Sequence, residues 1–276
     1  MAQDLVGGQA LIEGVMMRRK EKVAIATLDK EGEIHLTQWN FLPFPRLRKI
    51  PFIRGIVVLA ETLYLGTKAL LFSTEEYAEE KVSSFSLGLT AFFSFGFGIL
   101  IFVLLPLFLT RVLIPEDGLF FNFIDGVFRV IVFFAYLLGI SMMKDIKRVF
   151  AFHGAEHMAI HAYEHDEALT VHSCKKYPTM HPRCGTSFLL FVLFVSIFVF
   201  SFVVSESFLI KFFGRLLLLP VVASLSYELL RVSARFERFF FFKLLSYPGI
   251  LLQKITTKKP DEEQLEVALK ALKGVL

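Results

Sequence analysis

Long apolar runs alternate with charged segments along this chain. Residues 82–110 contain no Asp, Glu, Lys or Arg and exceed the roughly 20 residues that an α-helix needs to cross hydrocarbon. Three further apolar segments follow, at 121–143, at 185–205 and, with charges and a proline inside it, at 212–230. The pattern therefore predicts about four transmembrane helices, arranged as two hairpins.

Charged residues inside or beside these segments are expected to be paired, because an isolated charge in hydrocarbon is costly. Asp125 and Arg129 lie one helical turn apart near the start of the second segment, so we expect them to form an ion pair. Glu228 lies near the end of the fourth segment, and Arg231 is its nearest partner in sequence. A carboxylate at the membrane edge is also a candidate site residue.

A polar stripe marks the helix expected over residues 52–73. Arg54, Glu61 and Lys68 recur there at seven-residue intervals in an otherwise apolar sequence. Such a narrow stripe is typical of a helix that lies along the membrane surface, and we expect an interfacial helix over 52–81. A fifth crossing and a re-entrant segment remain alternatives.

The polar ends of the chain predict two small elements. The sequence KVAIATLDKEGEIHLTQW, residues 22–39, has two β-rich runs around Asp-Lys-Glu-Gly and predicts a hairpin in a small N-terminal sheet. The tail, residues 260–276, predicts an amphipathic helix with Asp261 as its N-cap. This helix is expected to pack on the protein's own cytoplasmic part, with a partner or the membrane as alternatives.

The expected fold class is a membrane α-helical protein with interfacial and amphipathic helices and a small cytoplasmic N-terminal β-sheet, an α+β arrangement. Composition agrees, because 55% hydrophobic residues and a mean hydropathy of +0.59 are too apolar for an ordinary soluble protein. The expected parts are a cytoplasmic N-terminal domain (1–51), an interfacial helix (52–81), a transmembrane hairpin (82–143), a His-rich loop (144–184), a second transmembrane hairpin (185–230) and a cytoplasmic tail (231–276).

Basic residues indicate which face of the membrane each part occupies. Of the 30 Lys and Arg residues, 26 fall within 1–81, 144–184 and 228–276, and the positive-inside tendency makes this face, with both termini, cytoplasmic. The first residues lack the order of a secretory signal. The two cysteines, Cys174 and Cys184, argue against a disulfide framework and leave a ligand or free-thiol role open.

Four of the seven histidines recur every four residues in FHGAEHMAIHAYEH. On an α-helix this spacing advances about 40° around the axis and about 6 Å along it, so His153 and His157 can bind one ion from the same face. Glu156 completes His-x-x-Glu-His, the order of inverted zincins, in which the Glu is a general base. The pattern predicts a zinc site, with a pH-sensitive cluster as the alternative. His161 and His165 are expected to form a solvated polar face.

A third metal ligand has to come from another part of the chain. Glu164 lies roughly 10 and 16 Å along the helix axis from the two histidines, too far to join both unless the helix breaks. His181 and Cys184, in YPTMHPRCGTSF, are both competent zinc ligands and lie just before the third apolar segment. We expect these residues to meet at the cytoplasmic membrane face, where Arg183 or Arg231 would steady negative charge during a reaction.

Several short motifs occur together in this chain: GGQALIEGVMMR at 7–18, HGAEH at 153–157, YE at 163–164, HPRCGTSF at 181–188 and YELLR at 227–231. They resemble the motifs of the YqhQ-like family, bacterial membrane proteins of unknown function that are described as predicted metal-dependent enzymes. The resemblance implies a multi-pass protein of the bacterial inner membrane. It also adds Glu13 and Arg18 to the candidate site residues and supports Glu164.

The first of these motifs has two interpretations. Gly7, Gly8 and Gly14 permit tight turns or close backbone approach, which would let Glu13 and Arg18 reach into the cytoplasmic site. Alternatively, the motif is a strand before the hairpin, with glycines that shape a bulge.

The leading hypothesis is a zinc-dependent hydrolase at the inner leaflet that acts on a membrane-associated peptide or lipid. The alternative is a non-enzymatic scaffold or accessory factor with a closed structural site of His153, His157, His181 and Cys184. Its basic face would recruit a protein, an anionic lipid or ribosomal RNA. A transporter is a third alternative, although the apolar segments carry few charges that could line an ion path.

Overall fold

The computed structural model describes residues 6–42, 44–78, 82–236 and 239–276, so a few residues of the predicted parts 1–51, 52–81 and 231–276 lie outside it. Its elements in chain order are β1 (Gly7–Leu11), β2 (Gly14–Arg19), β3 (Lys22–Leu28), β4 (Ile34–Asn40), the short helix η1 (Leu47–Lys49), α1 (Ile53–Ala78), α2 (Ser84–Ile99), the π-helical turn η2 (Leu100–Leu104), α3 (Leu105–Leu113), α4 (Leu119–Ser141), α5 (Lys144–Glu164), α6 (Val171–Cys174), α7 (Thr186–Phe200), α8 (Phe208–Arg235), α9 (Phe240–Thr256) and α10 (Glu262–Val275).

The N-terminal strands form one antiparallel sheet with the order β1-β2-β3-β4. The predicted hairpin is confirmed, since β3 and β4 pair along their whole length around a turn at Asp29. The Asp29 carboxylate accepts backbone N–H groups from Glu31 at 3.0 Å and from Glu33 at 2.8 Å, which fixes the turn. β1 pairs only with β2, so its outer edge is left for other parts of the chain.

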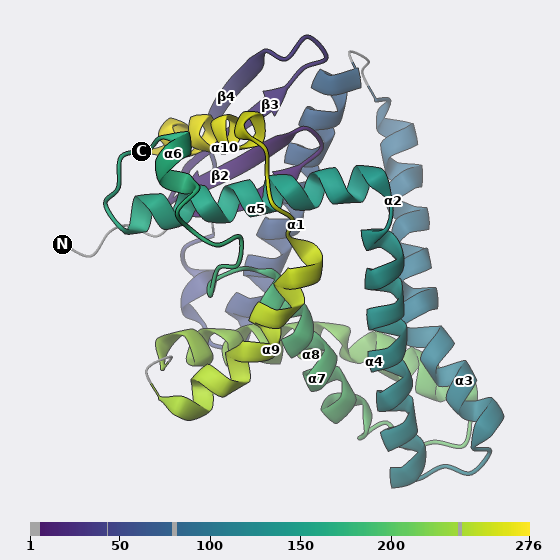
Figure 1. The fold of residues 1–276 in the computed structure, drawn as a ribbon. Coiled ribbons are helices and arrows are strands. Elements are labelled where there is room, and N and C mark those ends of the chain that lie inside the picture. The colour runs from purple at the N-terminus through teal and green to yellow at the C-terminus, as the bar shows by residue number, and fades with distance from the viewer. Residues whose placement is uncertain (1–5, 43, 79–81, 237–238) are drawn as a thin grey trace.

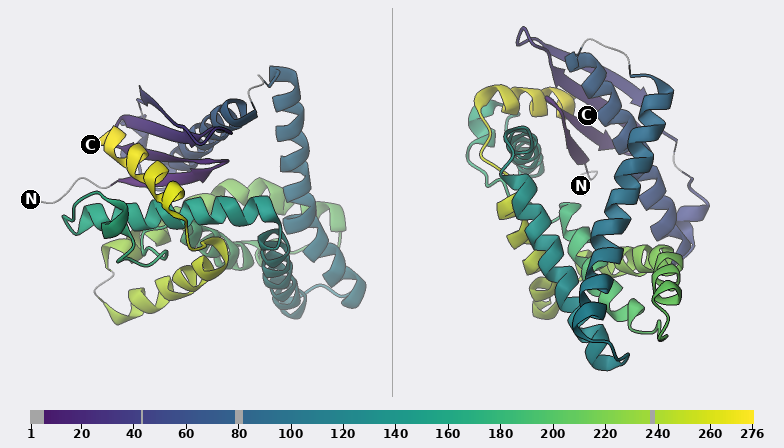
Figure 2. Two further views of the ribbon diagram at one scale, coloured as in Figure 1. Left: turned by 45° about the horizontal axis from the view of Figure 1, so that its top comes forward. Right: turned by 90° about the vertical axis from the view of Figure 1, so that its right-hand side faces the viewer.

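Helices cover both faces of this sheet (Figures 1 and 2). α5 and α10 pack on one face, where Val15 and Met17 are buried. α1 packs on the other face, where Met16 and Ile25 are buried around Leu65. Successive strand side chains point to opposite faces, so β2 and β3 supply both cores. The sheet thereby fixes the position of α5, which carries the His-x-x-Glu-His motif.

The predicted tail helix is confirmed as α10. Asp261 accepts the backbone N–H of Gln264 at 2.8 Å, and the Gln264 side chain accepts the backbone N–H of Asp261 at 3.1 Å, a complete capping box. Leu265, Leu269 and Leu272 are buried against the sheet and α5. Of the predicted alternatives, packing on the protein's own polar part is therefore the one observed.

Four helical segments within the described residues are long and apolar enough to cross a membrane: Ile53–Ala78, Phe85–Leu113, Leu119–Ser141 and Phe208–Ser233. Three of them coincide with predicted spans. The remaining predicted span, 185–205, forms the 15-residue α7, which is apolar but shorter than the roughly 20 residues a crossing needs. The architecture is an α+β membrane fold, as the sequence predicts, with α1 rather than α7 among the long apolar helices.

The polar stripe of α1 contacts other parts of the protein, although only its middle residue, Glu61, is buried. Glu61 is buried and forms an ion pair with Arg48, which lies in η1. The Lys68 ammonium lies 5.1 Å from the centroid of the Trp39 ring on β4. The stripe therefore serves contacts with the sheet and with η1, and the interfacial location of this helix stays a prediction.

Glu228 on α8 forms an ion pair with Arg54 on α1 and accepts the backbone N–H of Phe52 at 3.1 Å. The expectation that Arg231 is its partner is wrong, because α1 packs along α8 and brings Arg54 to the carboxylate. Arg231 acts on Glu228 only through its charge.

A buried ion cluster joins three of the apolar helices. The predicted pair of Asp125 and Arg129 on α4 is confirmed, and Arg215 on α8 adds a second guanidinium at 2.8 Å from Asp125. Arg129 also donates to the backbone carbonyl of Ser196 on α7 at 3.2 Å. Buried charges are tolerated when they are paired in this way, so the cluster fixes α4, α7 and α8 relative to one another.

Candidate metal site

α5 is a continuous helix that runs between the sheet and the apolar helices (Figure 1). Its helical geometry continues without a break through residue 160. Gly154 explains how another segment approaches it, because a β-carbon there would lie 2.1 Å from the carbonyl oxygen of Lys258. The segment after α9 can therefore run directly against α5, where the Lys258 N–H donates to the carbonyl of Phe150 at 2.8 Å.

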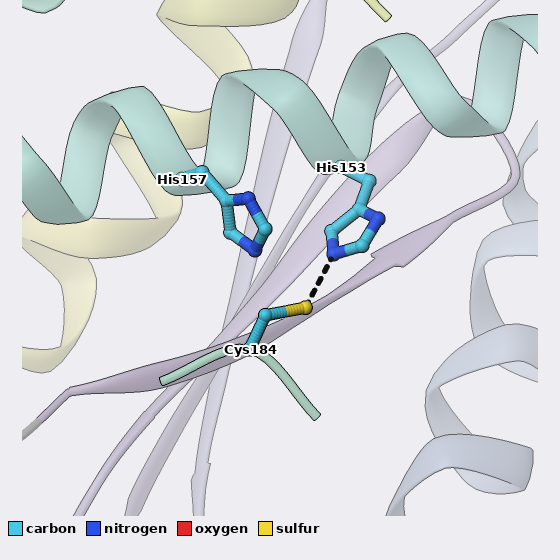
Figure 3. A group of neighbouring side chains, drawn as sticks. All are labelled: His153, His157 and Cys184. Atoms are coloured by element: carbon cyan, nitrogen blue, oxygen red, sulfur yellow. Dashed lines mark hydrogen bonds between the residues drawn. The ribbon is translucent and has the colours of Figure 1, made fainter. Parts of the chain in front are cut away.

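His153, His157 and Cys184 form a compact group of metal-ligand side chains. One ligand atom from each lies within 4.8 Å of the other two. The two imidazole rings have centroids 4.3 Å apart, and Nε2 of His153 is 3.2 Å from the Cys184 sulfur. Figure 3 shows both rings projecting from α5 toward the cysteine, which arrives from the segment before α7. The structure thus brings together His153, His157 and Cys184, three of the four predicted ligands, in an arrangement that could hold a metal ion.

Backbone carbonyls hold both histidines in the orientation that a metal requires. Nδ1 of His153 donates to the carbonyl of Thr256 at 2.8 Å, and Nδ1 of His157 donates to that of Thr179 at 2.6 Å. This assignment leaves the Nε2 lone pair of each ring available toward Cys184. Metal-binding histidines in proteins almost always have their second nitrogen engaged in this manner.

The surroundings of the three side chains set their protonation. Burial lowers the pKa of His153, and burial together with the neighbouring histidines lowers the pKa of His157 to about 2. Both rings are therefore neutral at physiological pH, which is the form that binds a metal. Burial raises the pKa of the Cys184 thiol to about 11, so the thiol keeps its proton until a cation replaces it. Two imidazoles and one thiol are a donor set that fits zinc.

The loop that carries Cys184 is tied to α9. The side-chain oxygen of Gln253 accepts the backbone N–H of His181 at 2.7 Å, and its amide donates to the His181 carbonyl at 3.0 Å. Thr186 donates to the Cys184 sulfur from its backbone at 3.4 Å and lies 3.1 Å from it through its hydroxyl. The thiol is thus held in place by groups on both sides of the loop.

Glu156 lies between this group and the edge of the sheet. Its carboxyl group accepts a hydrogen bond from the backbone of Gly8, and burial raises the pKa of Glu156 to about 8. A β-carbon at residue 8 would lie 2.7 Å from Oε1 of Glu156, so only glycine permits this approach. The charge of Glu156 in turn contributes to the raised pKa of Cys184. The first motif therefore forms a strand, as its second interpretation predicts, and its backbone approaches Glu156 at Gly8, whereas Glu13 and Arg18 contact other parts of the protein.

A second group, which the sequence interpretation did not separate, consists of His161, Glu164 and His181. The expectation that His161 belongs to a solvated face is wrong. Its ring is stacked on Tyr177, with centroids 5.7 Å apart, and lies 4.5 Å from the ring of His181. The signal was present in the four-residue period, which continues from His157 to His161 along an unbroken helix.

The hydrogen bonds of this second group differ from those of the first. Nδ1 of His181 accepts the backbone N–H of Arg183 at 3.2 Å, so its Nε2 carries the proton and faces Glu164 at 3.3 Å. Glu164 also forms an ion pair with Arg183. His181 therefore presents a proton rather than a lone pair, and the second group is hydrogen-bonded internally instead of being prepared for a metal.

The remaining candidate residues lie around these groups. Glu13 forms an ion pair with Arg148 on α5, beside a cavity of 640 Å³. Arg18 lies in a separate cleft on the α1 side of the sheet. Cys174 is buried in the core between the sheet, α5 and α10, so it is a structural thiol.

A comparison with known families matches residues 50–276 to the model described as "Protein of unknown function (DUF1385)". The chain belongs to this family. The DUF1385 chain is 36% identical over 298 residues to the "Uncharacterized protein YqhQ" of Bacillus subtilis (strain 168), with 98% of this chain and 92% of the relative covered. No solved structure matches the chain. The YqhQ-like resemblance is thus confirmed, while neither description assigns an activity or a metal.

The candidate metal ligands of this DUF1385 protein, His153, His157 and Cys184, lie within the part that the family model matches. Gly8, Glu13 and Arg18 precede residue 50 and fall in the larger region that the Bacillus relative covers. The contact between Gly8 and Glu156 therefore joins the family-matched region to the N-terminal sheet.

Proposed function

We propose that this protein is a zinc-dependent hydrolase of the membrane, with the metal held by His153, His157 and Cys184. One observation carries the proposal. Both Nδ1 atoms donate hydrogen bonds to backbone carbonyls, and one ligand atom from each of the three side chains lies within 4.8 Å of the other two. Catalytic zinc sites characteristically use three protein ligands and keep a further position open. Bound zinc would supply Lewis-acid activation of the attacking water.

Glu156 is the proposed general base, and the positive charge of a bound metal would favour its ionised form against the effect of burial, so the carboxylate would be available in the metal-loaded protein. The water oxygen would form the new bond to the acyl or phosphoryl centre, the leaving-group bond would break, and Glu156 would carry the water's proton to the leaving group. The Gly8 contact supports this role because it holds the carboxyl group in one orientation. Two candidates would steady negative charge: Arg183, which precedes Cys184 in the chain and forms an ion pair with Glu164, and Arg231, whose charge acts on Glu228.

The proposal also includes a location and a substrate class. The distribution of basic residues and the four long apolar helices support a multi-pass protein of the bacterial inner membrane with cytoplasmic N and C termini. The site would then face the cytoplasm beside the inner leaflet. A membrane-associated peptide or lipid is the corresponding substrate.

Cobalt substitution tests the open coordination position directly. Full-length protein would be purified in detergent, analysed for metal, stripped and reloaded with Co²⁺, whose visible bands report its geometry and ligands. Acetohydroxamate is the probe, since it binds only where a position is exchangeable. The parent is expected to hold one equivalent of metal and to change its spectrum with the probe, and Glu156→Gln is expected to keep the metal.

Each result of this experiment has a defined meaning. A parent protein without stoichiometric metal, or with metal that survives His157→Ala unchanged, contradicts the proposed site. If the visible spectrum of the Co²⁺-loaded protein does not change when acetohydroxamate is added, the result contradicts the hydrolase and supports the second candidate below.

The second candidate is a scaffold or accessory factor with a structural zinc site. Two sets of contacts favour it: the hydrogen bonds between Gln253 and the His181 backbone, and the hydrogen bond from His153 to the Thr256 carbonyl. A metal here would join α5, the loop before α7 and the end of α9 into one unit. In that case the basic face would recruit a protein, anionic lipid or ribosomal partner.

A further inference from the structure

A basic cleft lies on the opposite side of β1 and β2 from the helix that carries the metal ligands. It has a volume of 330 Å³ and is bounded by the sheet, by η1 and by α1. The cleft is basic because Arg18, Lys20 and Arg48 line it, and the backbone of Gly7 and Gly8 forms part of its wall. Among the described residues that line the cleft, none carries a carboxylate.

The two guanidinium groups of this cleft are incompletely compensated. Arg48 forms an ion pair with Glu61, yet its Nε is buried with no hydrogen-bond partner in the described part of the chain. Arg18 donates to the carbonyl of Lys20 at 3.0 Å and lies over the ring of Phe41, and no described carboxylate pairs with it. Burial and the nearby charge of Arg48 lower the pKa of Arg18. Two guanidinium groups held close together in this way create a site for an anion.

The backbone of β1 connects the cleft to the proposed catalytic base. Gly8 lines the cleft, and the same residue donates its hydrogen bond to Glu156 on the metal side. β1 is the edge strand of the sheet, so a ligand can pass around it without displacing another strand. An anionic group near Arg18 and a reacting bond near Glu156 would therefore be separated by little more than one strand.

The segment next to the cleft has the character of a membrane-surface element. Leu42, Phe44, Ile50 and Phe52 expose large apolar side chains on either side of Arg48. Apolar side chains interleaved with basic ones are typical of protein surfaces that enter the headgroup region of an anionic membrane. At such a surface the cleft would be within reach of phospholipid headgroups.

We propose that this cleft binds the phosphate of the substrate, through Arg18 and Arg48, and that the substrate is a phosphate-bearing compound supplied as a lipid headgroup. The statement about substrate class rests on the proposed function, whereas phosphate binding itself does not require the metal. The terminal guanidinium nitrogens that the contacts with Lys20 and Glu61 leave available would donate to the phosphate oxygens, a role for which arginine is well suited.

Calorimetric titration of the detergent-purified full-length protein tests this proposal. The ligands are short-chain dihexanoyl phosphatidic acid, inorganic phosphate and the uncharged dihexanoylglycerol. Loss of one charged hydrogen-bonding group is expected to weaken phosphatidic acid binding about tenfold or more in Arg18→Gln. Lys22→Gln, which removes an exposed charge from the same sheet outside this cleft, is the matched control and is expected to bind like the parent. Arg18→Lys keeps the positive charge but loses the planar guanidinium group, and its affinity for phosphatidic acid is expected to lie between those of Arg18→Gln and the parent.

The outcomes separate the source of the phosphate from the existence of the site. Tighter binding of phosphatidic acid than of inorganic phosphate assigns a lipid, and equal binding assigns a soluble phosphate compound. Unchanged phosphatidic acid binding in both Arg18 variants, or equal binding of the uncharged lipid, overturns the site. Because His157→Ala is expected to keep phosphate binding, failure of the zinc proposal and failure of this one give different results.

Discussion

Gly8 and Glu156 are in direct contact across the boundary between the sheet and α5. The backbone of Gly8 donates a hydrogen bond to the Glu156 carboxyl group, and a β-carbon on Gly8 would come within 2.7 Å of Oε1. The glycine-rich strand therefore holds a buried carboxyl group that adjoins a proposed metal ligand in sequence. This contact joins the small N-terminal sheet to the distant His-rich helix.

Gly8→Ala is expected to lower the stability of the protein by about 1–3 kcal/mol, because the added methyl group would collide with the Glu156 carboxyl group and with the backbone carbonyl of Met16 on β2. Thermal unfolding of the detergent-purified protein measures the change. Gly7→Ala is a matched control, since a β-carbon there meets nothing within 4 Å. Equal melting temperatures for the two variants would show that strand and helix are not in this contact.

His153→Ala is expected to abolish stoichiometric zinc binding, whereas His161→Ala is expected to retain it. The two groups differ in their hydrogen bonds. In the first group the Nε2 lone pairs of His153 and His157 remain available to a metal, whereas in the second group the Nδ1 lone pair of His181 accepts a backbone N–H. Metal analysis after dialysis against a weak chelator measures both. Retention by His153→Ala with loss by His161→Ala would place the metal in the second group instead.

Gly154→Ala is expected to weaken zinc binding about 10–100-fold without changing a ligand. The new methyl group would collide with the Lys258 carbonyl and displace the nearby Thr256 carbonyl that orients His153. Competition with a chromogenic chelator gives the affinity. Gly139→Ala, at a position on α4 with open space, serves as the control. An unchanged affinity in Gly154→Ala would contradict the orienting role of Thr256.

Asp125→Asn is expected to destabilise the helical part by about 3–5 kcal/mol, because Arg129 and the fully buried Arg215 would lose their shared counter-charge. Unfolding in denaturant, followed by circular dichroism, measures the loss. Glu116→Gln removes an exposed carboxylate from the loop before α4 and is expected to leave the stability unchanged. A similar stability for both variants would mean that the cluster does not hold α4 to α8.

Local sequence signals predicted much of this fold. The β3–β4 hairpin, the capped α10 and the pair of Asp125 with Arg129 depend on residues near one another in the chain, so their patterns sufficed. The proximity of His153, His157 and Cys184 was also predicted, with His181 as the alternative to Cys184, because the two histidines share one helix and the cysteine lies in a motif that the topology returns to the same place.

Contacts between distant segments could not be predicted from the same signals. Arg54 replaces Arg231 as the partner of Glu228 because two helices pack together, and no periodicity encodes which faces meet. The choice of Cys184 over His181 depends on a loop conformation fixed by Gln253. The approach of β1 to Glu156 likewise depends on tertiary packing.

X-ray absorption spectroscopy at the zinc edge tests the central claim most directly. The account predicts two nitrogen scatterers at about 2.0–2.1 Å, one sulfur at about 2.3 Å and one light-atom ligand that exchanges with solvent or probe. Cys184→Ser is expected to remove the sulfur contribution and leave the nitrogens. A shell without sulfur in the parent protein, or no bound zinc at all, would contradict the account.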